Sequence, residues 1–109
     1  VHIHEADRAA GYLEFENARV RWFLSVNSRY LPEEVKAKGQ TTFRSITIDE
    51  EELEFSGGFT DLHTMVYRDI LEGKGCGLED ARTAIEIVHH IRNATPVGLK
   101  GDFHTLLRA

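Results

Sequence analysis

Cysteine is almost absent from the sequence, which also contains no long apolar run and no pattern of a secretory signal. Its one thiol, Cys76, cannot form a disulfide within the chain. A disulfide framework is therefore excluded, and nothing points to an oxidising compartment. No apolar run approaches the roughly 18 residues that span a membrane, and the first residues lack a secretory signal. These absences favour a cytoplasmic protein with no membrane partner.

Positive charge is also scarce. The chain carries 13 Lys and Arg residues against 18 Asp and Glu residues, a formal net charge of −5, and the acidic excess lies within residues 49–109. Binding along a phosphate backbone needs a broad basic surface, so nucleic acid is not an expected partner. With 41% hydrophobic and 28% charged residues, residues 1–109 have the composition of a single domain.

Two kinds of binding motif are missing. No Gly-x-Gly-x-x-Gly stands between a strand and a helix, so we expect no dinucleotide cofactor to bind these residues by the usual device. Six histidines suggest a metal, yet no helical pair has i, i+4 spacing and Cys76 has no Cys-x-x-Cys companion. Histidines on polar faces are therefore favoured over a metal site.

The glycines of Gly73-Lys74-Gly75-Cys76-Gly77 allow two interpretations. Glycine amides and a lysine can bind phosphate, but a phosphate loop joins a strand to a helix and places Ser or Thr after the lysine. Here the glycines lie between two helical patterns, so a helix-helix turn is favoured. Cys76 could act as a nucleophile with a histidine base, but no pattern places one beside it, and a loop or buried thiol is favoured.

The first half of the chain has the period-two alternation of β-strands. Runs of this kind cover 1–4, 13–16, 19–26, 42–48 and 52–55. The short link Glu16-Asn17-Ala18 predicts an antiparallel hairpin, and the acidic turn Asp49-Glu50-Glu51 joins the last two runs. Between them Pro32 is placed to begin a helical turn through Val35 and Lys36.

The second half changes to helical periodicity. One apolar stripe comprises Phe59, Leu62, Val66 and Ile70, with Thr60 as the predicted N-cap and Gly73 as the terminator. A second helix begins after Gly77 and ends before Pro96, and its predicted buried stripe is Leu78, Ala81, Ile85, Val88 and Ile91. In the tail after Val97, the predicted anchors are Leu99, Phe103, Leu106 and Leu107.

Strands followed by helices predict an α+β fold. We expect a mostly antiparallel sheet of about five strands, with two C-terminal helices packed on one face. The other face, predicted to carry Tyr12, Arg19, Arg21 and Phe23, would be amphipathic and suited to a partner subunit.

The segment Gly57-Gly58-Phe59-Thr60-Asp61-Leu62-His63-Thr64 is the most suggestive of a ligand site. Free amides at a helix N-terminus favour an anion, and Thr60, Asp61, His63 and Thr64 add hydroxyl, carboxylate and imidazole groups within one turn. On the pattern alone, capping by Thr60 and Asp61 with a solvent-facing His63 is the simpler interpretation.

Several blocks resemble one dehydrogenase family. They are the run 9–25, Arg44-Ser45-Ile46-Thr47, the run 55–64, Gly75-Cys76-Gly77-Leu78-Glu79-Asp80-Ala81-Arg82 and Gly101-Asp102-Phe103-His104. They resemble the carboxy-terminal domain of the glucose-fructose oxidoreductase / inositol dehydrogenase superfamily, specifically UDP-N-acetyl-2-amino-2-deoxyglucuronate 3-dehydrogenases of bacterial lipopolysaccharide biosynthesis. The blocks occur in order and span nearly the whole chain.

The resemblance implies an enzyme with an amino-terminal Rossmann domain for NAD and an α+β domain that supplies the substrate wall and subunit contacts. The resemblance covers only the second of these domains, and a start without Met in strand-like sequence agrees with a fragment or a processed chain. The family's Glu-Lys-Pro lysine and Asp-x-Gly-x-His histidine have no counterpart here, so no catalytic residue is assigned. The resemblance also places Thr60, Asp61, His63 and Thr64 near the sugar cleft and favours the open sheet face as a homo-oligomer contact.

The sequence thus predicts the substrate-binding and oligomerisation domain of an NAD-dependent UDP-sugar-acid dehydrogenase, inactive alone. One alternative is a free-standing, non-catalytic interaction module that oligomerises with the same fold. A weaker one is another dehydrogenase of the superfamily with a different sugar.

Overall fold

The computed structural model describes residues 1–57 and 60–108. The chain divides into two compact units. Unit 1 contains Val1–Leu31 and His90–Ala109, and unit 2 contains Pro32–His89. That residues 1–109 form a single domain stays a prediction.

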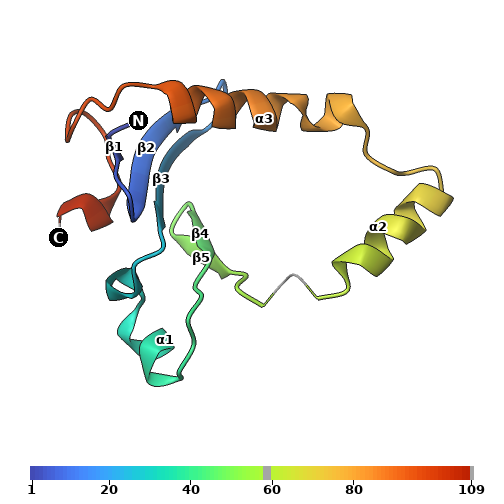
Figure 1. Cartoon of the computed structure of the whole chain (residues 1–109), viewed down its shortest axis with the longest axis horizontal. Coiled ribbons are helices and arrows are strands. Elements are labelled where there is room, and N and C mark those ends of the chain that lie inside the picture. Colours follow the sequence, from blue (N-terminus) through green and yellow to red (C-terminus); the bar gives the residue numbers. More distant parts are fainter. Residues whose placement is uncertain (58–59, 109) are drawn as a thin grey trace. The chain divides into compact units, whose positions relative to one another are not determined.

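Unit 1 contains a three-stranded antiparallel sheet. Its strands are β1 (Ile3–His4), β2 (Arg8–Glu14) and β3 (Arg19–Ser25), in the order β1-β2-β3 (Figure 1). The turn between β2 and β3 is closed by the Phe15 N–H, which donates to the Ala18 carbonyl at 2.8 Å. The predicted antiparallel hairpin is therefore confirmed.

Register assigns the side chains of this sheet to two faces. Tyr12 pairs with Arg21 and Ala10 with Phe23, so these residues share a face with Arg19, as predicted. That face is not fully open, however. The chain's own tail contacts it, because Arg21 pairs with Asp102 and the Phe23 ring lies 5.7 Å from the His104 ring.

On the opposite face of the sheet, the position of the Trp22 side chain requires a glycine at position 11. Gly11 lies opposite Trp22, and a Cβ added at Gly11 would come within 2.6 Å of the indole Cζ2. Only a residue without a side chain lets the indole lie over the strand. The end of helix α3 (Leu78–Asn93) lies on this side, where Ile91 lines a hollow together with Trp22.

The core of unit 1 is small. Ala10 is fully buried at the centre of the sheet, and Leu107 is buried in η2 (Thr105–Arg108), the short 3-10 helix of the tail. Of the predicted tail anchors, Leu107 is buried and Phe103 half-buried, whereas Leu99 and Leu106 stay exposed. A second 3-10 helix, η1 (Ser28–Tyr30), follows β3, and its Tyr30 ring packs edge-on against Phe23 at 5.0 Å.

Unit 2 begins with the helical turn expected after Pro32. Helix α1 (Glu33–Ala37) follows Pro32 directly and buries Val35. An antiparallel hairpin then forms from β4 (Ser45–Ile48) and β5 (Glu51–Glu54). Its two turn residues, Asp49 and Glu50, have φ of 48° and 75°, the left-handed backbone that a two-residue hairpin turn requires.

The α+β class is confirmed, but the predicted sheet of about five strands was too large. The five strands form one sheet of three and one of two. Alternation identifies a strand without identifying its hydrogen-bonding neighbour. The tight turns fix β2 to β3 and β4 to β5, whereas the chain between β3 and β4 forms η1 and α1 instead of a direct strand connection.

The two predicted helices are present. Helix α2 (Leu62–Leu71) ends as expected, because Gly73 has φ of 74° and donates its N–H to the Ile70 carbonyl, while the Lys74 N–H donates to the Asp69 carbonyl. This is the paired hydrogen-bond pattern of a glycine-terminated helix. Helix α3 ends at Asn93, before Pro96, and has Glu79 and Asp80 in its first turn, as predicted.

Two details of the helices differ from the predictions. The N-cap of α2 is Asp61 rather than Thr60, and Phe59 of the predicted stripe lies outside the described residues. Within 62–71 and 78–93 no residue is buried, and the Leu78 side chain is 90% exposed. Helical periodicity shows which side is apolar, but not what covers it.

Among the described residues, no helix is both long and apolar enough to cross a membrane.

Candidate functional site

The predicted ligand residues lie together at the start of α2. Asp61 is the N-cap in a left-handed conformation, with φ of 61° and ψ of 14°, and its side chain makes no capping hydrogen bond. Its backbone carbonyl accepts the Met65 N–H at 3.0 Å, which closes the first turn. The capping role predicted for Thr60 and Asp61 side chains is therefore not seen. An Asp tolerates this backbone better than most residues.

All four candidate side chains are exposed. Thr60 and Asp61 precede the helix, and His63 and Thr64 lie in its first turn. Because the Asp61 carboxylate does not cap the helix, the first N–H groups have no side-chain acceptor there and keep the partial positive charge of a helix N-terminus. A carboxylate, an imidazole, two hydroxyls and the polarised amides of the helix start thus lie within five consecutive residues, and the four side chains are exposed.

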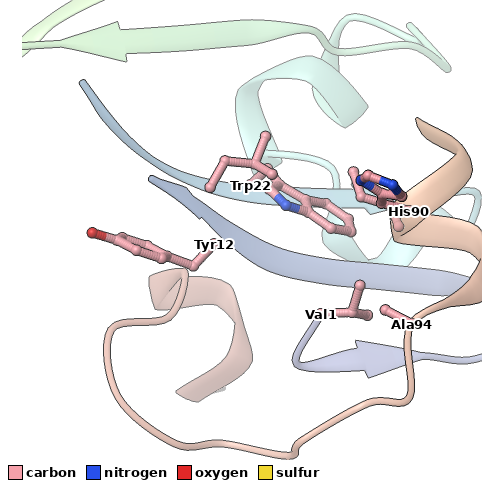
Figure 2. A pocket seen from close by; sticks show the side chains of 7 residues that line it. Val1, Tyr12, Trp22, His90 and Ala94 are labelled. Atoms are coloured by element: carbon pink, nitrogen blue, oxygen red, sulfur yellow. The ribbon is translucent and has the colours of Figure 1, made fainter. Parts of the chain in front are cut away.

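A separate hollow lies in unit 1 and was not predicted from the sequence. It has a volume of about 150 Å³ and is lined by Val1, Tyr12, Leu13, Trp22, His90, Ile91 and Ala94. Figure 2 shows the Tyr12 side chain directed away from the Trp22 and His90 rings. The hollow is mostly apolar and contains no carboxylate or arginine, so it offers little to a charged nucleotide. The sequence feature that could have indicated this hollow is the pairing of the small Gly11 with the large Trp22 on the neighbouring strand.

The glycine loop between α2 and α3 confirms the helix-helix interpretation. The N–H groups of Gly73 and Lys74 close the end of α2, and the Gly77 N–H donates to the Asp80 carboxylate at 2.7 Å at the start of α3. The Lys74 Nζ pairs with Glu72 at 3.1 Å. These three amides are occupied by the chain itself, which favours a turn over a phosphate-binding loop. Cys76 is exposed in the loop.

A polar cluster of unit 1 joins the β1–β2 turn to η1. Arg8 Nε lies 2.6 Å from Glu5 Oε2, Arg8 Nη1 donates to the Tyr30 hydroxyl at 2.8 Å, and Asn27 Nδ2 donates to Asp7 Oδ2 at 2.7 Å. The hydrogen bond from Arg8 holds the pKa of Glu5 below its usual value, and that from Asn27 does the same for Asp7. Acidic and basic groups are matched, which indicates a structural cluster.

Among the described residues, no group of three or more His, Cys, Asp or Glu side chains is placed to hold a metal ion.

Known structures provide the comparison. No protein-family model matches the chain. The WlbA (WbpB) dehydrogenase from Thermus thermophilus, solved in complex with NAD and alpha-ketoglutarate, is 44% identical over 97% of this chain with a TM-score of 0.88. A second structure of that enzyme, in complex with NAD and UDP-GlcNAcA, is 43% identical over 96% of this chain, also with a TM-score of 0.88.

In both cases this chain covers 34% of the other, so it spans about a third of that dehydrogenase. Identity above 40% over nearly the whole chain, together with a closely similar backbone, is far more specific than a shared fold class. The predicted resemblance is therefore confirmed: over nearly its whole length, the chain is similar to a segment that makes up about a third of the WlbA (WbpB) dehydrogenase.

Proposed function

We propose that the chain is the carboxy-terminal substrate-binding and oligomerisation domain of an NAD-dependent UDP-sugar-acid 3-dehydrogenase of lipopolysaccharide sugar biosynthesis. The observation that carries the proposal is its 44% identity to a dehydrogenase that was solved with NAD. The same enzyme was solved with UDP-GlcNAcA. A nucleotide sugar acid is thus the substrate class to test first.

NAD binding is assigned to the remainder of the intact enzyme. The glycine loop of this chain uses its amides to close α2 and to begin α3, and the chain has no Gly-x-Gly-x-x-Gly. In the proposed reaction, NAD bound elsewhere in the intact enzyme would supply the hydride acceptor for oxidation of the sugar. The role proposed for this chain is to bind and orient the sugar, not to hold the cofactor.

The chemistry at the start of α2 suits such a substrate. A UDP-sugar acid carries a carboxylate, a diphosphate and several hydroxyls. The polarised amides at the helix start and the His63 imidazole can donate to an anionic oxygen. The Asp61 carboxylate can accept a hydrogen bond from a sugar hydroxyl. The hydroxyls of Thr60 and Thr64 can donate or accept one. Exposure of all four side chains leaves them available to a ligand.

The function is tested by comparing the intact protein with the isolated chain. The intact protein should produce NADH when UDP-GlcNAcA and NAD are added, whereas residues 1–109 alone should not. Light scattering of the eluted protein should also show a dimer or larger assembly. An assembling protein that neither binds nor oxidises a nucleotide sugar would instead support the non-catalytic module. Oxidation of only a different nucleotide sugar would reassign the substrate.

The site residues are tested by replacing His63. In the intact enzyme, His63→Ala removes a proposed donor to an anionic group, and hydrogen bonds to charged groups contribute about 1.5–3 kcal/mol. We therefore expect kcat/KM to fall by about tenfold or more. His4→Ala is the matched control, because His4 is also exposed but lies on β1. If His63→Ala and His4→Ala had the same kinetics, His63 would be a solvent-facing residue without a role in substrate binding.

A further inference from the structure

The segment after α3 runs back to the start of the chain, where Val1 and His2, the two residues before β1, fix it. The Val97 N–H donates to the Val1 carbonyl and the Gly98 N–H to the His2 carbonyl, both at 3.0 Å. The buried His2 side chain adds a third bond, from its Nε2 to the Lys100 carbonyl at 2.9 Å. The first part of the tail is therefore held by donors and acceptors that do not depend on its own side chains.

The second part of the tail is held through side chains on the sheet. Arg21 Nη1 lies 3.4 Å from Asp102 Oδ1, and the His104 ring lies 5.7 Å from that of Phe23 on β3. The His104 carbonyl accepts the Leu107 N–H at 3.0 Å, while its Nδ1 accepts the Leu106 N–H at 3.2 Å. His104 thus caps η2 with both its backbone and its ring, and η2 carries the buried Leu107.

The capping bond requires an unprotonated His104 Nδ1. A nitrogen that carries a proton is a donor, so protonation removes the acceptor of the Leu106 N–H. It also places a positive charge near Arg21, on the strand beneath. Burial of the ring, and then the Arg21 charge, lower the pKa of His104.

The other charged or titratable groups nearby do not provide a free counter-charge. Asp102 in the tail is engaged by Arg21, and Arg108 lies over the Phe103 ring. Tyr30 of η1 packs on Phe23, and its hydroxyl accepts from Arg8. A proton on His104 therefore enters surroundings that are on balance cationic.

We propose that residues 97–108 form an acid-sensitive clasp on the sheet of unit 1, in which neutral His104 holds η2 and Leu107 in place and protonated His104 releases them. The sign follows from the depressed pKa. The stabilisation is complete above the ordinary histidine pKa of about 6.5 and is lost as the pH falls through the lower folded value. Release uncovers Phe23 and the sheet face that carries Arg21, whereas the Val97 and Gly98 bonds have no such pH dependence.

Hydrogen–deuterium exchange of the intact protein tests the clasp. Protection factors for peptides within residues 99–108 are compared at about pH 7.5 and about pH 5, after correction for intrinsic exchange. Loss of one net hydrogen bond, about 1 kcal/mol, corresponds to about a fivefold loss of protection. Peptides of β2 should change far less. Unchanged protection of the tail in the wild type would overturn the proposal.

Two variants separate His104 from general acid effects. His104→Gln keeps a side-chain acceptor without a titrating ring, so tail protection should become nearly independent of pH. His4→Gln, at an exposed histidine of β1, should behave as the wild type. A His104→Gln tail that loosens in acid as much as the wild type would contradict the proposal. If that variant does not fold, NMR titration of the wild type decides, because the Leu106 amide must shift together with the His104 ring.

Discussion

Replacing Gly11 with Ala is the sharpest test of how unit 1 is built. A Cβ at Gly11 would lie 2.6, 2.8 and 2.9 Å from three atoms of the Trp22 indole. Real Cβ atoms do not approach other heavy atoms so closely, and a rigid bicyclic ring cannot bend its far end away. Either the indole leaves its position or strands β2 and β3 move apart at a pair that lies in the middle of their register.

The expected destabilisation follows from these distances. Overpacking a filled site costs about 1–3 kcal/mol, and three sub-contact distances to one ring place Gly11→Ala in the upper part of that range. The added methyl also restricts the unfolded chain, which offsets about 0.4–1 kcal/mol. We therefore expect a net loss of about 2 kcal/mol in the free energy of unfolding.

Urea unfolding followed by far-UV circular dichroism measures this loss without relying on Trp22 fluorescence. Gly57→Ala is the matched control, since an added Cβ there meets nothing within 4 Å, and it should change stability by less than about 0.5 kcal/mol. Trp22→Phe should suppress part of the Gly11→Ala effect in a double-mutant cycle, with a coupling of about 1 kcal/mol. Equal stabilities of the two alanine variants, or no coupling to Trp22, would refute the packing argument.

Two further predictions concern single positions. Gly73 has φ of 74° with open space around it, so Gly73→Ala should cost about 1 kcal/mol through backbone strain alone, measured by the same urea titration. Asn27→Ala removes the bond that chiefly lowers the pKa of Asp7, so carbon-detected NMR should show that pKa rise towards 3.8. Because a lowered carboxyl pKa stabilises the fold above its unfolded value, the stability difference between wild type and Asn27→Ala should shrink as the pH falls through this range.

The local elements could be predicted from the sequence because their signals are local. Alternation through Val20, Trp22 and Leu24 defined a strand, and Gly73 and Pro96 marked where the two long helices end. The glycine loop could also be identified as a turn, since its neighbours on both sides were helical. The position of the candidate site at the start of α2 followed from the same patterns. The N-cap of α2 could not be predicted in this way, because the choice between Thr60 and Asp61 depends on which residue takes the left-handed backbone.

Sequence alone determined the class of elements, their order and the resemblance to a dehydrogenase domain, since periodicity, turn residues and ordered motifs are properties of neighbouring residues. Tertiary structure decided which strands share a sheet, that the tail occupies part of the face expected to be open, and that His104 caps η2. These features join residues far apart in the chain, such as Phe23 with His104 and His2 with Lys100. Hydrogen-bond partners and ring contacts of that kind leave no periodic trace in the sequence, so only the folded chain reveals them.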